Sequence, residues 1–140
     1  MADVLAAGAV RKMKTELGEQ VSYELPLGDS DLPMNPLLGK SLQLQYQGQI
    51  NCVACDRKTK KSFSQGYCYP CFRRLAQCDT CIVSPEKCHY AQGTCREPQW
   101  GETNCMIDHI FYLANTSRLK VGISRHSQVP TRWMDQGATQ

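Results

Sequence analysis

Nine cysteines in a chain of 140 residues constrain the fold more than any other feature of the sequence. Such a density occurs in disulfide-linked secreted domains and in metal-binding proteins, two classes that occupy opposite redox compartments. The first twenty residues place Asp3 before a run of small residues and the basic residues after it, the reverse of a secretory signal. In a reducing cytosol, clustered cysteines are metal ligands rather than bridges. We therefore predict a cytoplasmic, metal-stabilised protein.

The strongest motif is a pair of CxxC sequences, Cys52 with Cys55 and Cys68 with Cys71, separated by twelve residues. Each CxxC lets two thiolates meet one ion, and two of them complete the tetrahedron of a structural zinc site. Gly66 precedes the second pair, where a tight turn is needed. Two redox dithiols are the alternative, which a single CxxC beside a βαβ pattern would favour. The spacing favours one closed zinc site that contributes folding energy rather than catalysis.

The following segment offers more ligands than a second tetrahedral site needs: Cys78, Cys81, Cys88, His89, Cys95, Cys105 and His109. The third CxxC, Cys78 with Cys81, provides the first candidates. Cys88 or His89, and Cys95, are the nearest residues that would close the shell. We favour zinc here too, which makes two ions, while an iron–sulfur cluster remains an alternative that spacing does not separate. Cys105 and His109 either join this site or are a buried thiol and a strand residue.

Positive charge is concentrated on the first cysteine segment, although the net charge is only +3. Residues 51–75 carry six basic and one acidic side chain. Folded together with a tail arginine, they would form a surface for the phosphates of DNA or RNA. This predicted surface comprises Arg57, Lys58, Lys60, Lys61, Arg73, Arg74 and Arg125. The alternative is a solvated loop, and the interleaved Tyr67, Tyr69 and Phe72 either stack on bases or cover the metal.

The first fifty residues have the alternation of a β-rich module. Alternation around Tyr23 predicts a half-buried strand after a hairpin turn at Gly18. Residues 27–40 are rich in Gly, Asp, Pro and Asn, which indicates a loop. Residues 41–50 show the clearest alternation in the chain and predict a further strand.

The tail has the pattern of two strands and a helix. Residues 109–115 and 119–124 predict the strands, and Pro130 opens the helix. The fold class is therefore small, metal-stabilised α+β. We divide the chain into a β-rich module (1–50), a zinc-ribbon-like metal-binding region with one or two zinc sites (51–108), and a β-hairpin plus helix (109–140). No apolar run approaches the length that crosses a bilayer, so we expect no membrane association.

The tail also resembles the opening of the GIY-YIG endonuclease fold, which has two motif-bearing strands and then a helix that carries an arginine. The matching residues are Ile110, Phe111 and Tyr112 in the first motif, Lys120, Val121 and Gly122 in the second, and Arg132 on the helix. The resemblance implies catalytic roles for Tyr112, Lys120 and Arg132 in orienting water and phosphate. The first motif lacks its glycine, and the chain ends before the family's metal-binding glutamate. The resemblance therefore implies an incomplete ββα unit, and an ordinary hairpin and helix is the alternative.

The whole chain resembles the N-terminal half of a bacterial cysteine-rich family known only as a domain of unknown function. The residues that carry this resemblance are RKM, the CxxC and CYPC pairs, CREPQWGE, and the phrases YLAN, KVGI, PTRW and DQGA in that order. The resemblance brings no activity with it. It implies that family members continue past Gln140, and the ending QGATQ fits a truncated chain.

Three functions are compatible with these patterns. The leading hypothesis is a zinc-stabilised module associated with DNA or RNA. The second is a zinc-stabilised protein-interaction module whose basic residues only solubilise the chain. The third is a phosphodiesterase of the GIY-YIG type that missing C-terminal sequence would complete, so we expect no activity from this chain alone. The sequence gives no oligomeric state.

Overall fold

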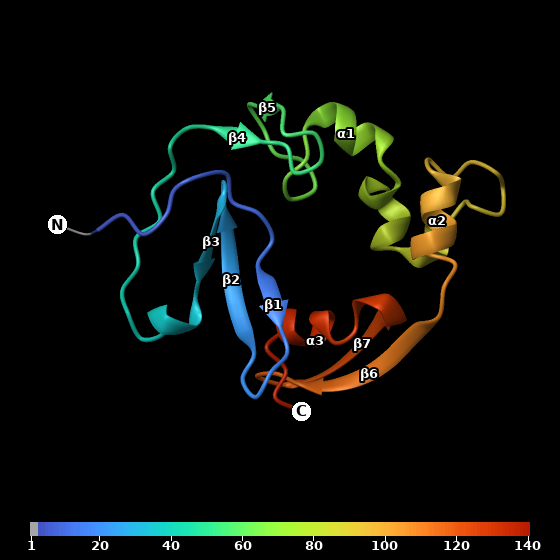
Figure 1. The fold of residues 1–140 in the computed structure, drawn as a ribbon. Coiled ribbons are helices and arrows are strands. Elements are labelled where there is room, and N and C mark those ends of the chain that lie inside the picture. Colours follow the sequence, from blue (N-terminus) through green and yellow to red (C-terminus); the bar gives the residue numbers. More distant parts are fainter. Residues whose placement is uncertain (1–2) are drawn as a thin grey trace. The chain divides into compact units, whose positions relative to one another are not determined.

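The computed structural model describes residues 3–140, which form two compact units (Figure 1). The strand unit joins the residues up to Leu44 to Asp108–Gln140, and the cysteine unit is Gln45–Ile107. Strands and short helices are mixed along the chain, which confirms the predicted small α+β class. The division of the chain into three parts at residues 50 and 108 remains a prediction.

A three-stranded antiparallel sheet begins the strand unit, in the order β1-β2-β3. Its strands are β1 (Lys14–Glu16), β2 (Ser22–Leu27) and β3 (Ser30–Pro33). The predicted strand around Tyr23 and the turn at Gly18 are confirmed, since β1 and β2 pair across that turn.

The loop predicted over residues 27–40 is wrong in part, because it contains β3 and the 3-10 helix η1 (Asn35–Leu37). Leu27 pairs with Ser30, so Gly28 and Asp29 form a two-residue hairpin turn. Gly28 has φ +59, a conformation that suits glycine at such a turn. The Gly, Asp, Pro and Asn content of this segment indicated a loop, although β3 lies within it.

The strand predicted over residues 41–50 is wrong. Only its end is extended and paired, in β4 (Ile50–Asn51). The side chains of Leu42, Leu44 and Tyr46 are 49%, 91% and 72% exposed, so the alternating residues bury no face. Alternating residues form a strand only where a neighbouring strand pairs with them and a core packs against one face. Within residues 3–140, no strand pairs with residues 41–49.

The tail contains the predicted strands β6 (His109–Asn115) and β7 (Leu119–Arg125), which pair antiparallel along their whole length. The predicted helix is α3 (Thr131–Asp135), preceded by the 3-10 helix η5 (His126–Gln128).

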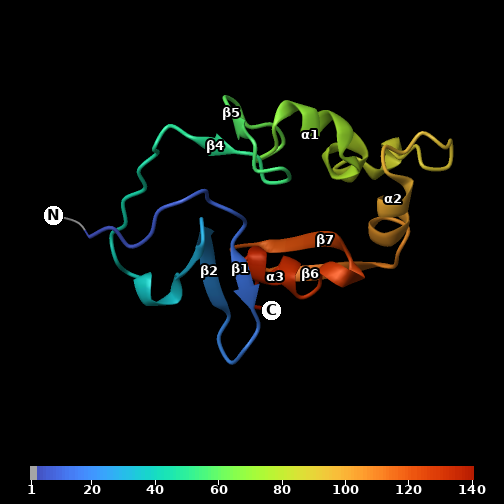
Figure 2. The same ribbon diagram turned by 45° about the horizontal axis from the view of Figure 1, so that its top comes forward.

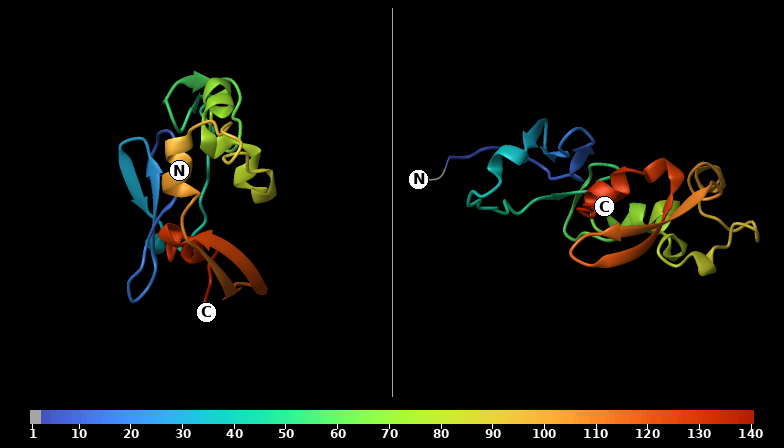
Figure 3. Two further views of the ribbon diagram at one scale, coloured as in Figure 1. Left: turned by 90° about the vertical axis from the view of Figure 1, so that its right-hand side faces the viewer. Right: turned by 90° about the horizontal axis from the view of Figure 1, so that it is seen from below.

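Helix α3 covers one face of this hairpin, as Figure 3 shows. Met134 on α3 is buried, and the rings of Tyr112 and Trp133 meet edge to face with centroids 6.0 Å apart. Helix α3 also contacts β1 beside it (Figure 2), and the Tyr23 hydroxyl donates to the Met134 carbonyl at 3.1 Å. These contacts join the tail to the N-terminal sheet.

The cysteine unit consists of very short elements and buries few residues. They are β4, β5 (Lys58–Thr59), α1 (Tyr69–Arg74), the 3-10 helices η2 (Ala76–Cys78), η3 (Thr80–Ile82) and η4 (Pro85–Lys87), and α2 (Pro98–Asn104). Its hydrophobic cluster is formed by Cys52, Cys68 and Cys71, against which Tyr67 and Leu75 pack. A core built mainly of thiols supplies less hydrophobic stabilisation than one of larger aliphatic and aromatic side chains.

Within residues 3–140, no helix has both the length and the apolar character required to cross a membrane.

Candidate metal centre

The β4–β5 hairpin positions the first CxxC pair. The Cys52 N–H donates to the Arg57 carbonyl at 2.8 Å, and the Asp56 N–H donates back to the Cys52 carbonyl at 2.9 Å. The chain turns tightly here, with Asp56 at φ +59, and the Ala54 N–H points at the Cys52 sulfur at 3.4 Å. Backbone donors to sulfur are the feature that stabilises a thiolate in such a turn.

A second turn brings the other CxxC pair to the first. The Val53 N–H donates to the Gly66 carbonyl at 2.9 Å, and Gly66 has φ +137. A Cβ at Gly66 would lie 2.7 Å from Val53 Cγ1, so both the backbone conformation and the close approach require glycine. Cys68 then caps the N-terminus of α1 and Cys71 lies in its first turn.

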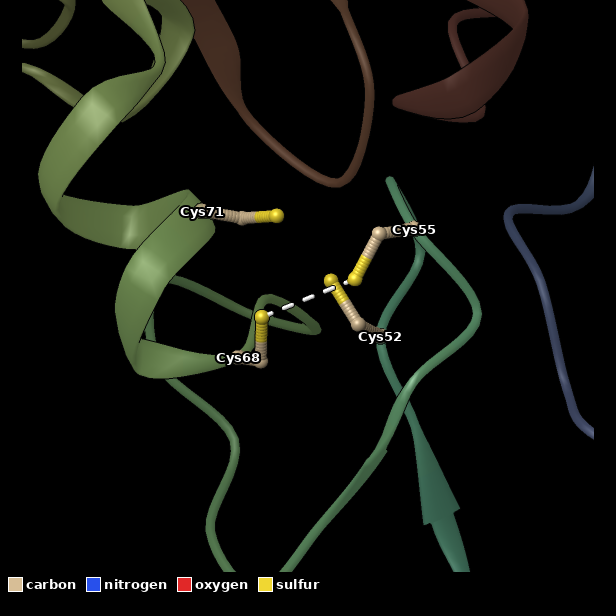
Figure 4. Close-up of side chains that lie close together, drawn as sticks. All are labelled: Cys52, Cys55, Cys68 and Cys71. Carbon is tan, nitrogen blue, oxygen red and sulfur yellow. Dashed lines mark hydrogen bonds between the residues drawn. The ribbon is translucent and has the colours of Figure 1, made fainter.

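The four thiols of Cys52, Cys55, Cys68 and Cys71 converge from these two turns (Figure 4). Their sulfurs all lie within 4.8 Å of one another, and those of Cys55 and Cys68 are 3.7 Å apart. Cys55 is exposed and the other three are buried. The group could hold a metal ion, with four protein ligands that leave no position for substrate or water.

The thiols of this group differ in acidity. Burial raises the pKa of Cys52, but backbone hydrogen bonds from Cys68, Cys55 and Ala54 together outweigh it and lower the pKa to about 6. Burial, followed by hydrogen bonds among the neighbouring thiols, raises the pKa of Cys71 to about 12. Cys52 therefore ionises easily to a thiolate, whereas Cys71 keeps its proton until a metal displaces it.

A second group that could hold a metal is formed by Asp79, Cys81 and His89, whose ligand atoms also lie within 4.8 Å of one another. Sequence reasoning missed Asp79, although it stands inside the third CxxC pair and carboxylate oxygen is an accepted zinc ligand. Cys78 is buried on η2 and takes no part in this group.

Hydrogen bonds already engage the polar atoms of that second group. The two ring nitrogens of His89 lie 2.8 Å from Thr94 Oγ1 and 3.0 Å from Asp79 Oδ2. Asp79 also accepts from the Thr80 N–H at 2.7 Å and lies 3.2 Å from Arg96 Nε. The bond with His89, followed by the Thr80 N–H and the charge of Arg96, lowers the pKa of Asp79. A metal here would have to replace part of this network.

The remaining predicted ligands are divided between the units. Cys88, Cys95 and Cys105 line a small apolar cavity together with Cys81. His109 is the first residue of β6 and belongs to the strand unit. No disulfide joins any of the nine cysteines, all of which lie within the described residues.

The basic residues predicted to face phosphate lie mostly beside the four-cysteine group. Six of them are exposed in the cysteine unit: Arg57, Lys58, Lys60, Lys61, Arg73 and Arg74. Arg125, at the end of β7, is half-buried and belongs to the strand unit.

The three residues that the GIY-YIG resemblance marks as catalytic have different surroundings. Tyr112 is half-buried, lies opposite Gly122 across the hairpin, and donates to Gln136 Oε1 at 3.1 Å. Lys120 on β7 and Arg132 on α3 are exposed. Their catalytic roles remain predictions.

Comparison with protein families matches residues 39–140 to the family described as "Protein of unknown function (DUF2797)". The match spans more than half of the chain and includes all nine cysteines. It agrees with the resemblance to a cysteine-rich domain of unknown function. No curated protein and no solved structure matches the chain.

Proposed function

Since the chain belongs to the DUF2797 family, whose description assigns no activity, we propose its function from the site itself. It is a zinc-binding protein that associates with nucleic acid through the surface beside its four-cysteine group.

The donor set supports zinc at Cys52, Cys55, Cys68 and Cys71. Four thiolates arranged around one point are typical of structural zinc, which prefers tetrahedral sulfur ligands and has no redox chemistry. Because three of them, Cys52, Cys68 and Cys71, also make up the hydrophobic cluster of their unit, the ion would hold that unit together. Its role is structural, and function must come from the surface around it.

A cluster of three aromatic rings beside the metal centre carries the proposal of nucleic-acid association. Phe63 lies 5.3 Å from Tyr69 and 5.5 Å from Phe72, measured between ring centroids. Lys61 Nζ lies 5.4 Å from the centroid of the Phe63 ring, and the Tyr69 side chain is 53% exposed. Open aromatic faces with an adjacent cation are what unstacked bases and their phosphates bind.

The charge around these rings supports the same function. The six exposed basic residues come from β5, its flanking turns and α1, the same segment that supplies the rings. Among the residues that the structure describes, none of the six forms an ion pair with a carboxylate. Their charge is therefore available to phosphate, and binding through it would weaken steeply with salt.

The test is the binding of fluorescently labelled single-stranded DNA and RNA, followed by anisotropy at several salt concentrations. We expect binding that weakens as salt rises from about 50 mM to about 200 mM. The triple substitution Lys58→Glu, Lys60→Glu and Lys61→Glu should weaken it roughly tenfold or more, since three phosphate contacts become repulsions. Tyr69→Ala should weaken it about fivefold or more through lost stacking, with a smaller effect on the salt dependence.

A charge-matched control distinguishes binding at this surface from a general effect of the net charge. The substitutions Lys40→Glu, Lys87→Glu and Arg118→Glu change the net charge equally at exposed positions elsewhere. If this control weakened binding as much as the first triple variant, or if the unaltered chain bound neither nucleic acid at low salt, the proposal would fail. A protein-interaction module would then be the better account.

A further inference from the structure

Four cysteines outside the first metal centre surround one cavity, and we propose that they form a second thiolate metal centre. The ligands are Cys81, Cys88, Cys95 and Cys105. The cofactor is a thiophilic metal, either one zinc ion or an iron–sulfur cluster, because four thiolates bind both. This inference does not depend on nucleic-acid association.

The cavity gathers these cysteines from four separate places in the sequence. Cys81 lies on η3, Cys88 follows η4, Cys95 lies in the loop before α2, and Cys105 caps the end of α2. All four line a space of about 20 Å³. A metal that binds the four sulfurs would account for their convergence on one cavity.

The walls of the cavity suit a metal–sulfur centre. Ile82, Tyr90, Trp100 and Met106 surround the thiols with apolar surface. Gly101 on α2 is buried, and a Cβ there would already touch Cys95 Sγ at 3.5 Å. An apolar shell of this kind limits the access of water to a metal and to its thiolates.

The segment around this cavity buries few side chains. From Ala76 to Ile107 its elements are single turns and one helix of seven residues, and only Ala76, Cys78 and Gly101 are buried. A cross-link between four distant cysteines would order it, as structural metals do in small domains.

Two residues that the sequence favoured as ligands are poorer candidates. Cys78 is buried on η2 and does not line the cavity. His89 has both ring nitrogens within hydrogen-bond distance of Thr94 and Asp79. The cavity thus selects Cys105 in place of Cys78 or His89.

The distances between the four sulfurs are compatible with either one zinc ion or an iron–sulfur cluster. The four cavity thiols do not form a group with all sulfurs within 4.8 Å, unlike the thiols of the first centre. A cluster binds each thiolate through a different iron and holds the sulfurs farther apart, whereas one zinc ion would draw them together.

The test measures zinc, iron and acid-labile sulfide in the whole chain, purified under reducing and anaerobic conditions, together with its visible spectrum. We expect a second centre in addition to the first: either two zinc ions per chain, or one zinc with iron, sulfide and a brown colour. Cys105→Ser should remove only the second centre, and Cys78→Ser should leave both. A single zinc with no iron in the unaltered chain would overturn the proposal, as would loss of the second centre in Cys78→Ser but not in Cys105→Ser.

X-ray absorption of the unaltered chain gives the same answer without a substitution. We expect sulfur alone around the metal, at about 2.3 Å if it is zinc. A nitrogen or oxygen ligand at about 2.0–2.1 Å would assign the site to His89 or Asp79 and contradict the all-thiolate centre.

Discussion

Cys52 and Cys71 belong to one group of thiols, yet their pKa values are shifted in opposite directions. Backbone N–H groups around Cys52 lower its pKa to about 6, whereas burial and the neighbouring thiols raise the pKa of Cys71 to about 12. Near neutral pH the metal-free group therefore holds at least one proton that zinc must displace. Because only thiolates bind the ion, affinity falls as pH falls.

Calorimetry tests this acidity. Zinc binding measured near neutral pH, in buffers of different ionisation enthalpy, should show the release of at least one proton per ion. Affinity should rise with pH, since deprotonation of Cys71 becomes less costly. An observed enthalpy that did not vary between buffers would contradict the prediction.

Gly66 shows how one residue joins the two CxxC pairs. Its φ of +137 and its approach to Val53 leave no room for a side chain, so Gly66→Ala meets both backbone strain and a steric clash. We expect it to lower the stability of the zinc-bound protein by about 1–3 kcal/mol in thermal unfolding. Gly93→Ala is the control, because Gly93 has φ +73 but open space around it. Equal effects of the two substitutions would show that the contact with Val53 does not matter.

Among the segments whose residues alternate, the prediction of a strand succeeded where a neighbouring segment of the chain pairs with it. β6 and β7 follow one another across a three-residue turn, so their alternating patterns predicted both strands. Residues 41–49 alternate just as clearly, but no strand in the described part of the chain pairs with them. The CxxC spacing likewise predicted a local site, whereas the cavity formed by Cys81 and Cys105 depends on loop conformations that no spacing rule gives.

The packing of α3 on the β6–β7 hairpin can be tested at Gly122. A Cβ at Gly122 would lie 2.4 Å from the ring of Tyr112, which is itself held by Trp133 and Gln136. Gly122→Ala should therefore cost about 1–3 kcal/mol in urea unfolding followed by Trp133 fluorescence in a Trp100→Phe background.

The neighbouring residue supplies the matched control. Val121 is 71% exposed on the other face of β7, so Val121→Ala should change stability by about 0.5 kcal/mol or less. If Gly122→Ala were as mild as Val121→Ala, α3 would not pack over the hairpin through Tyr112.

For the whole molecule, the two units differ in what stabilises them. The strand unit contains two antiparallel sheets and buries the side chains of Ala114, Ser124 and Met134. The hydrophobic cluster of the cysteine unit, in contrast, is made of thiols. If a chelator removes the metal under reducing conditions, the amides of Gln45–Ile107 should therefore lose their protection from hydrogen exchange, while those of β2, β6 and β7 keep theirs. Hydrogen exchange followed by mass spectrometry measures this, and a uniform loss of protection would contradict it.

In the proposed structure of the cysteine unit, one zinc ion is held by Cys52, Cys55, Cys68 and Cys71. Native mass spectrometry of the unaltered chain and of Cys52→Ser with Cys68→Ser tests it most directly. We expect the double variant to carry one zinc ion fewer than the unaltered chain, and Cys78→Ser to carry as many as the unaltered chain. Equal zinc content in the unaltered chain and the double variant would contradict it.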